Sequence, residues 1–238
     1  MESLKGKKVL ITGATGGIGQ QAAKLLAGSG AVVYLSGRSS EKLSAIAVQL
    51  GIPEERTYAA ALNNPDEVMA MGNYFTQQAG AMDILVNAAG VGIIKPMDIL
   101  SYEDFVQTLG ANLIAPFNLL KAFLPAMKEQ KKGLIINIPG VLGKVPMAGA
   151  AAYSASKYGL VGMMQSVREE LKRTEIRITN LFLGGVDSPF WDTIDLRVQR
   201  DKMIVAEEAA KAIWFLCQQP RSGVVSEMVL QPFNHQAI

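Results

Sequence analysis

The stretch TGATGGIG, residues Thr12 to Gly19, follows an apolar run and precedes an alanine-rich helical pattern. Its glycines, Gly13, Gly17 and Gly19, allow a sharp strand-to-helix turn and close approach of a ligand to the backbone. The helix start offers free N–H groups and a positive dipole end, which favour a phosphate. A tight turn without any ligand would use the same residues. The position after a buried strand at the start of the chain nevertheless favours a dinucleotide site.

The rest of the chain continues the same alternation of apolar β-branched runs and longer helical patterns. Repeated β-α-β alternation predicts a parallel sheet with helices on both faces. Right-handed crossovers make a Rossmann-like, doubly wound α/β fold of about seven strands the main candidate. No linker or repeat divides the chain, so we expect one domain over residues 1–238. The clearest predicted elements are strands at 7–12 and 31–36 and helices at 152–173 and 206–219.

Composition argues against several functions. The net charge is +2 and the basic residues are scattered, so we expect neither nucleic acid nor a membrane surface as partner. The one histidine, His235, lies near the C-terminus, which argues against a Ser-His-Asp hydrolase or a zinc site. The one cysteine, Cys217, lies in an apolar helical run and is expected to be buried. Without a signal peptide or an apolar run of spanning length, a cytoplasmic protein is expected.

The segment SGRSS follows the second predicted strand, where the adenosine ribose of a dinucleotide would lie. A carboxylate at this point would bind the ribose 2′-hydroxyl, and the segment contains none. Arg38 instead offers a guanidinium that can bind a 2′-phosphate through two hydrogen bonds. We therefore expect NADP(H), with NAD(H) as the less favoured cofactor. The alternative is a solvated arginine at a helix start.

A tyrosine and a lysine, Tyr153 and Lys157, lie four positions apart in the long helix predicted at 152–173. Residues at this spacing share a helix face. An ammonium beside a phenol lowers the phenol pKa, so the tyrosine could exchange a proton with a carbonyl or alcohol oxygen. Such a pair also occurs by chance in many helices. The corner ahead of it, Ile138-Pro139-Gly140, carries no hydroxyl to hold a substrate oxygen.

Taken together, these motifs resemble the short-chain dehydrogenase/reductase family over nearly the whole chain. The matching segments are TGxxxGIG at 12–19, NAAG at 87–90, Asn112 in ANLIAPF, Asn137 in IINI, Tyr153-x-x-x-Lys157, and GGVDSP at 184–189. The resemblance implies a nicotinamide cofactor and hydride exchange with a carbonyl or alcohol of a small molecule. The three-residue gap between tyrosine and lysine is similar to that of the family's carbonyl reductases.

The resemblance also implies roles for individual residues. Tyr153 would be the acid/base, Lys157 would hold the nicotinamide ribose and tune the tyrosine, and Asn112 would support a proton-relay water at a helix kink. No metal is implied. The implied cofactor-binding residues are Gly13, Thr15, Gly17, Ile18, Gly19, Arg38, Leu62, Asn87, Ala88, Gly90, Tyr153, Lys157, Gly184, Val186 and Ser188. A homodimer or homotetramer through the helices of Asn112 and Tyr153 is implied as well.

Departures from the family pattern leave the activity open. Gly140 stands where the family has a catalytic serine, and Ala61 where it has an aspartate that helps to place the adenine. Loss of one oxygen donor commonly costs about 10²–10³ in rate, which predicts a weakened enzyme. A serine at 140 should raise kcat/KM, unless the residue needs φ > 0, in which case it strains the loop. The alternative is a weak or inactive nucleotide-binding protein with a sensing or regulatory role.

The stretch from about Gly185 to Val205 lacks a clear periodic pattern, which is typical of a lid or a disordered loop. It contains Phe190 and Trp191, which predict an apolar cover for the substrate. Arg197 or Arg200 would offer a charge to an anion. The alternative is that the aromatic residues pack on the body and the arginines are solvated.

Overall fold

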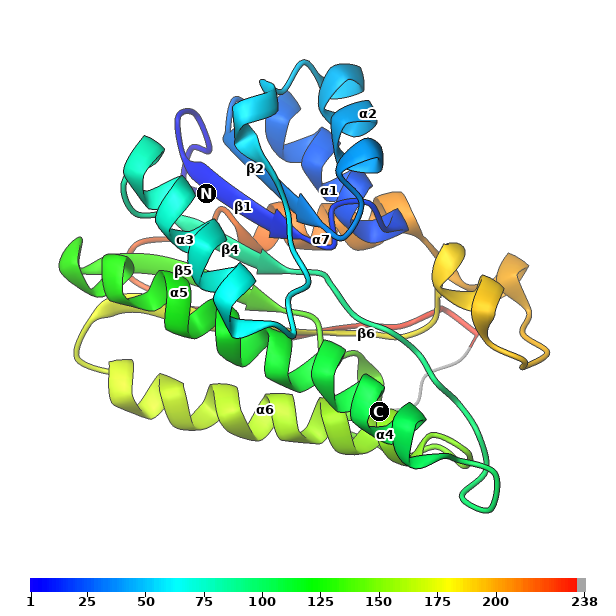
Figure 1. The fold of residues 1–238 in the computed structure, drawn as a ribbon. Helices are drawn as coiled ribbons and strands as arrows, with labels where there is room; N and C mark the ends of the chain where they lie inside the picture. Colours follow the sequence, from blue (N-terminus) through cyan, green and yellow to red (C-terminus); the bar gives the residue numbers. More distant parts are fainter. Residues whose placement is uncertain (235–238) are drawn as a thin grey trace.

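The computed structural model describes residues 1–234 and contains a seven-stranded parallel sheet (Figure 1). The strand order is β3-β2-β1-β4-β5-β6-β9. This confirms the predicted Rossmann-like α/β fold, with a switch point between β1 and β4 where ligands of such sheets bind. The strands are β1 (Lys8–Thr12), β2 (Val32–Gly37), β3 (Thr57–Ala59), β4 (Ile84–Asn87), β5 (Lys132–Asn137), β6 (Glu175–Leu183) and β9 (Glu227–Leu230).

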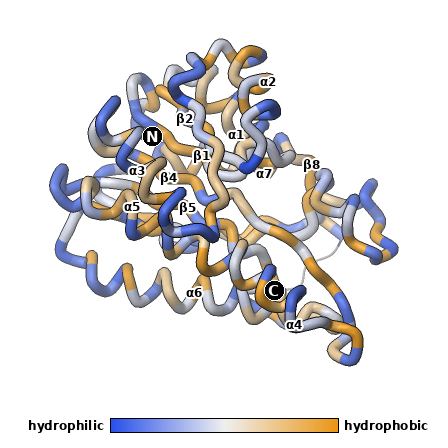
Figure 2. Tube along the Cα trace, in the orientation of Figure 1, coloured by the Kyte–Doolittle hydropathy of each residue, from blue (hydrophilic) through white to orange (hydrophobic). Residues whose placement is uncertain are grey.

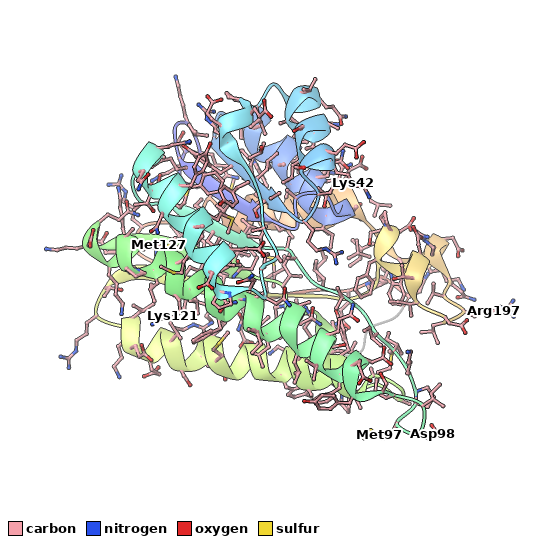
Figure 3. All side chains as sticks on the ribbon, viewed as in Figure 1. Lys42, Met97, Asp98, Lys121, Met127 and Arg197 are labelled. Carbon is pink, nitrogen blue, oxygen red and sulfur yellow. The ribbon has the colours of Figure 1, made fainter. Side chains whose placement is uncertain are left out.

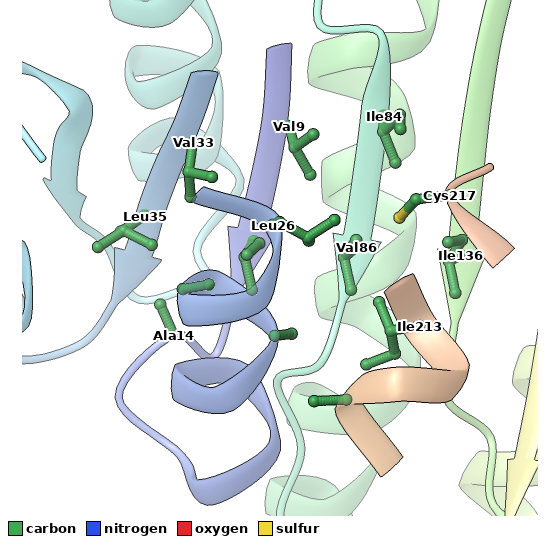
Figure 4. Packing of buried hydrophobic residues seen from close by; sticks show 14 of the residues in the cluster. Val9, Ala14, Leu26, Val33, Leu35, Ile84, Val86, Ile136, Ile213 and Cys217 are labelled. Carbon is green, nitrogen blue, oxygen red and sulfur yellow. The ribbon is translucent and has the colours of Figure 1, made fainter. Parts of the chain in front are cut away.

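Helices cover both faces of the sheet, and each face has its own apolar core. The helices are α1 (Gly17–Gly28), α2 (Ser40–Leu50) and α7 (Ala206–Leu216) on one face, and α3 (Pro65–Ala79), α5 (Ala115–Glu129) and α6 (Ala151–Leu171) on the other. Figure 4 shows Val9 and Ile84 of the strands packed with Leu26 of α1 and Ile213 of α7. Figure 2 shows the apolar character of the central strands. Because strand side chains alternate between faces, neighbouring strand positions supply the two cores.

Helices α2 and α3 begin and end at residues whose side chains or backbone conformations favour helix ends. Ser39 caps α2 by accepting from the backbone N–H of Lys42, and Gly51 ends it with φ 64°. Asn64 caps α3, and Pro65 is the first helical residue.

Residues Tyr102–Glu129 form one continuous helical run. Helix α4 (Tyr102–Leu109) passes through a π-helical turn (Gly110–Ile114) into α5. By length and composition this run would be long enough to cross a membrane, which the sequence prediction missed. Its buried side chains, including Leu119, Phe123 and Met127, pack in the core beneath α3 and α6. It is therefore a partly buried core helix.

Two segments extend beyond the carboxyl ends of the strands. The loop between β4 and α4 projects outward and carries Met97 and Asp98 at its tip (Figures 1 and 3). The segment after β6 contains a short strand pair, β7 (Val186–Asp187) with β8 (Ile204–Val205). Between these strands lie two 3₁₀ turns, Pro189–Thr193 and Arg200–Lys202. We call residues 186–205 the lid segment.

Candidate active site

The glycine-rich turn joins β1 to α1 in a conformation that leaves little room for side chains. Gly13 has φ +67°, and a Cβ there would lie 2.6 Å from the backbone nitrogen of Ala89. Gly16 precedes α1 and has no side chain with which to cap the first turn. Backbone N–H groups at this helix start are therefore available to an anion. The geometry is that expected for a pyrophosphate cradle.

Arg38 follows β2 directly and is exposed. Within residues 1–234 its guanidinium has no hydrogen bond or ion pair, so it is available to a ligand. Just beyond the neighbouring strand β3, the N–H of Ala61 donates to Oε2 of Glu67 at 2.7 Å. The carbonyl oxygen of Leu62 accepts from Asn118 at 3.0 Å. This edge of the site therefore holds the unpaired guanidinium of Arg38, and Ala61 contributes no carboxylate.

Asn112 lies in the π-helical turn and connects two elements of the site. It is 1% exposed. Its Oδ1 accepts from the N–H of Val91 at 2.9 Å, and its Nδ2 donates to the carbonyl of Val91 at 3.0 Å and to Oγ of Ser156 at 3.1 Å. Ser156 in turn donates to the carbonyl oxygen of Tyr153 at 2.7 Å. The loop after β4 is thereby fixed to the start of α6.

Tyr153 and Lys157 share a face of α6, as their spacing predicts. Nζ of Lys157 lies 5.3 Å from the centre of the Tyr153 ring and donates to the carbonyl oxygen of Ile138 at 3.0 Å. A Cβ on Gly90 would lie 3.0 Å from Oδ1 of Asn112 and 3.7 Å from Nζ of Lys157, so these groups meet beside the loop after β4. The structure thus brings together the three predicted catalytic residues.

Burial dominates the ionisation of this pair. It lowers the pKa of Lys157 to about 8 and raises the pKa of Tyr153 above its usual value. The expectation that the lysine lowers the pKa of the phenol below its usual value was wrong, because burial raises it. The ammonium lies against the ring and bonds Ile138, so its attraction for a phenolate does not outweigh the desolvation of that phenolate. Tyr153 is therefore a neutral phenol with a proton to donate.

Gly140 adopts a backbone conformation that few other residues tolerate. Its φ is 70° and its ψ is 170°. A Cβ at this position would lie 3.4 Å from the carbonyl oxygen of Leu183 on β6. The sequence left open whether residue 140 needs φ > 0, and the structure answers that it does.

Polar side chains form a buried row across the carboxyl half of the sheet. Thr12, Asn87, Asn137 and Asn180 are register partners on β1, β4, β5 and β6. Nδ2 of Asn87 donates to Oδ1 of Asn137 at 2.7 Å. Both amide atoms of Asn180 are buried without a hydrogen-bond partner in residues 1–234. The sequence analysis missed Asn180, although an asparagine within an otherwise apolar strand is a readable signal.

The lid segment covers the site. A Cβ on Gly17 would lie 2.9 Å from Cβ of Ser188, so the lid crosses the start of α1. Arg200 donates to Asp187 at 2.6 Å, to Asp192 at 2.7 Å and to the carbonyl oxygen of Ser188 at 3.0 Å. Its guanidinium is thus occupied by lid groups, contrary to the expectation that it is free for an anion or solvated. Arg197 points away from the body (Figure 3).

The other predicted cofactor residues lie near the carboxyl ends of the strands, whereas Cys217 lies in the core. Val186 is buried and its carbonyl oxygen accepts from Nε1 of Trp191 at 2.9 Å. Cys217 is buried in the core beneath α7, as expected, and burial raises the pKa of its thiol to about 12. His235 lies outside the described residues. The remaining predicted cofactor residues flank the glycine-rich turn and the ends of β4 and β6: Thr15, Ile18, Gly19, Ala88 and Gly184.

Comparison with known proteins identifies the family. Residues 7–198 match the model of the short chain dehydrogenases. The chain is 32% identical over 235 residues to an uncharacterised oxidoreductase of Staphylococcus epidermidis, covering 98% of this chain and 100% of that protein. It is also 32% identical over 237 residues to nodulation protein G of a Rhizobium species, covering 96% of each.

Two solved structures have the same fold along nearly the whole chain. A metagenomic short-chain oxidoreductase in complex with NADP is 33% identical, with a TM-score of 0.84 over 97% of this chain and 99% of that one. An alcohol dehydrogenase of the archaeon Thermococcus sibiricus, complexed with 5-hydroxy-NADP, is 25% identical, with a TM-score of 0.89 over 98% of this chain and 100% of that one. Sequence and structure agree that the chain is an oxidoreductase and belongs to the short-chain dehydrogenase family.

Proposed function

We propose that this protein is an NADP(H)-dependent oxidoreductase that interconverts a carbonyl and an alcohol on a small molecule. The observation that carries the proposal is the connection from Asn112 through Ser156 to Tyr153, with Lys157 buried beside the tyrosine ring. A half-buried, neutral tyrosine positioned in this way can give a proton to a developing alkoxide. Asn112, Tyr153 and Lys157 are the proposed catalytic residues.

The cofactor supplies a hydride to the carbonyl carbon or takes one from the alcohol. In the reducing direction, Tyr153 donates its phenolic proton to the substrate oxygen, which balances the charge that the hydride brings. The Lys157 ammonium then stabilises the phenolate, because a nearby cation favours the charged form of the phenol. Asn112 holds the loop after β4 and the start of α6 at a fixed separation. The oxidising direction reverses each proton step.

Arg38 supports NADP(H) over NAD(H). Its guanidinium is exposed at the end of β2 and is unpaired within residues 1–234, so a 2′-phosphate meets a cation and no competing carboxylate. The metagenomic relative was solved with NADP, which agrees with this choice. The glycine-rich turn around Gly13 and Gly17 would hold the pyrophosphate, and Ser188 would bond the nicotinamide end.

A weak or inactive nucleotide-binding protein with a sensing role is the second candidate. Gly140 stands at the proposed serine position, with φ 70°. Because glycine has no side chain, this corner supplies no hydroxyl to hold the substrate oxygen. A bound water can take over part of that role, because water-mediated hydrogen bonds approach direct ones in enthalpy.

We also propose a cytoplasmic homodimer or homotetramer. The helices that carry Asn112 and Tyr153 expose Phe117 and Tyr158, which are 48% and 44% exposed. Exposed large apolar side chains gathered on neighbouring helices are typical of a protein interface.

The test is the consumption of NADPH with a panel of ketones, aldehydes, diketones and quinones, with cofactor affinity measured separately. Tyr153→Phe keeps the ring and loses the proton, so it should abolish turnover and leave NADPH affinity within a few-fold. Full activity in this variant would refute the assignment of the acid/base. Tight NADPH binding without turnover of any carbonyl would favour the second candidate.

A further inference from the structure

Phe190 of the lid segment lies at the centre of the site. Its ring contacts the Tyr153 ring edge-to-face, with centroids 6.1 Å apart, and contacts the Trp191 ring at 5.4 Å. Tyr153 is the residue whose hydroxyl must meet the substrate oxygen. An apolar ring therefore occupies space directly beside the proposed proton donor.

Gly92 makes room for that ring. A Cβ built on Gly92 would overlap Cζ of Phe190 and lie 2.9 Å from its Cε2 and 2.8 Å from Cδ1 of Ile194. The φ of Gly92 is not in the left-handed region, so a backbone requirement does not explain this glycine. The missing side chain instead leaves a seat for a ring between the loop after β4 and Tyr153. We call this space the ring seat, bounded by Gly92, Tyr153, Trp191 and Ile194.

Phe190 belongs to the lid segment, whose parts are joined to one another by Arg200. Arg200 joins both ends of the lid turn through Asp187 and Asp192, and these ion pairs lie at the surface with side chains 42–56% exposed. Exposed ion pairs of this kind contribute little to stability. The lid is thus joined internally by Arg200, and it packs against the site through Phe190 and Ile194 beside Gly92 and through Ser188 beside Gly17.

We propose that the ring seat is the substrate subsite for an apolar, ring-sized group next to the reacting carbonyl, and that Phe190 fills it until such a substrate enters. The inference rests on the proposed function, since it places the subsite beside the tyrosine that would protonate the carbonyl oxygen. It names a substrate class: carbonyl compounds with an aromatic or similarly flat apolar ring adjacent to the C=O. Phe190 is then a specificity-determining residue, because a substrate has to displace it.

The first experiment measures binding without turnover. Phe190→Ala empties the seat, so acetophenone should bind the NADP⁺-loaded variant at least tenfold more tightly than the unmodified protein, in which the Phe190 ring has to be displaced first. Butan-2-one, which lacks a ring, should gain less than threefold. Phe190→Leu refills part of the seat and should give an intermediate gain. Phe215→Ala, which removes an exposed aromatic on α7, should leave both affinities unchanged.

The second experiment tests the seat itself. Gly92→Ala places a methyl group where the ring lies, so it should expel the lid and speed tryptic cleavage after the exposed Arg197. Gly92→Ala should lower the thermal midpoint more when it is made in the unmodified protein than when it is added to the Phe190→Ala variant. The second effect is smaller because Phe190→Ala has already removed the contact that Gly92→Ala disrupts.

The outcomes separate the two proposals. The ring seat would be overturned if the unmodified protein and Phe190→Ala bound acetophenone with equal affinity. It would also be overturned if the effects of Gly92→Ala and Phe190→Ala on the thermal midpoint were additive. Both results hold whether or not the protein turns over any carbonyl. Ring-selective tightening confirms the seat by a binding readout. Turnover that depends on Tyr153 tests the proposed function separately, and a panel in which ring-free ketones are the better substrates would overturn the substrate class alone.

Discussion

Replacing Gly140 by serine is the most direct test of how this site differs from its family pattern. The substitution adds a hydroxyl at the corner where the sequence resemblance places the family's catalytic serine. The backbone at φ 70° and ψ 170° lies in a region that is almost restricted to glycine. We expect Gly140→Ser to destabilise the fold and to bring no tenfold gain in kcat/KM.

The magnitude follows from the conformation. A non-glycine residue in this region costs about 1–3 kcal/mol. For a chain of this size, 1 kcal/mol shifts the thermal midpoint by about 2–4 °C, so the expected loss is about 2–12 °C. The Cβ would lie 3.4 Å from the carbonyl oxygen of Leu183, within reach of a short side chain. The new hydroxyl can donate to that oxygen, and it is then not available to a substrate.

The assay compares thermal unfolding, NADPH affinity and kcat/KM for the variant and two controls. Gly80→Ser has a similar backbone, φ 67° and ψ −158°, with only Lys8 Nζ near, at 3.8 Å, and should lose similar stability. Gly51→Ser lies in the left-handed helical region, φ 64° and ψ 29°, and should lose less. An unchanged midpoint together with a tenfold rise in kcat/KM for Gly140→Ser would refute this reasoning.

Three further predictions concern single charged or titratable groups. Arg38→Ala should erase most of the preference for NADPH over NADH, about tenfold to a hundredfold if the charge-assisted bond contributes about 1.5–3 kcal/mol, and equal affinities in the unmodified protein would contradict it. Lys157→Met should be more stable than the unmodified protein below pH 8. That advantage should shrink as the pH rises from about 8 toward 10.5, because the buried lysine loses its proton in the folded state first, and denaturant unfolding at several pH values measures it. The Cys217 thiol, buried with its pKa raised to about 12, should react with a thiol reagent only at the rate of unfolding; rapid labelling of the native protein would show that α7 opens locally.

The sequence predicts the fold well because local signals and the global pattern agree. Ser39 and Asn64, residue types that favour helix starts, cap α2 and α3, and buried β-branched runs become parallel strands. A strand in a doubly wound sheet is covered on both faces, so its apolar run is continuous and easy to read. The motif spacing also brings Asn112, Tyr153 and Lys157 into one site.

The details that decide catalysis depend on tertiary contacts and could not be read in the same way. Glycine adopts positive or negative φ with similar ease, so its presence at 140 does not reveal its conformation. The place of Phe190 depends on an absent side chain at Gly92, 98 positions earlier, and no local pattern links them. The pairing of Arg200 with two lid carboxylates was equally invisible, because exposed arginines have many possible partners.

The π-helical turn between α4 and α5 makes the orientation of α4 depend on the number of residues in the turn. A π turn holds one residue more than an α turn, so α4 is rotated by about 100° from where an unbroken helix would place it. Deleting Ala111 would let the helix regain regular hydrogen bonding and would swing Asp104 away from Lys95, its partner at 2.6 Å. Point substitutions on the exposed face of α4 should be tolerated, whereas an insertion or deletion of one residue should not. The genetic variation that this segment can accept is therefore substitution at constant length.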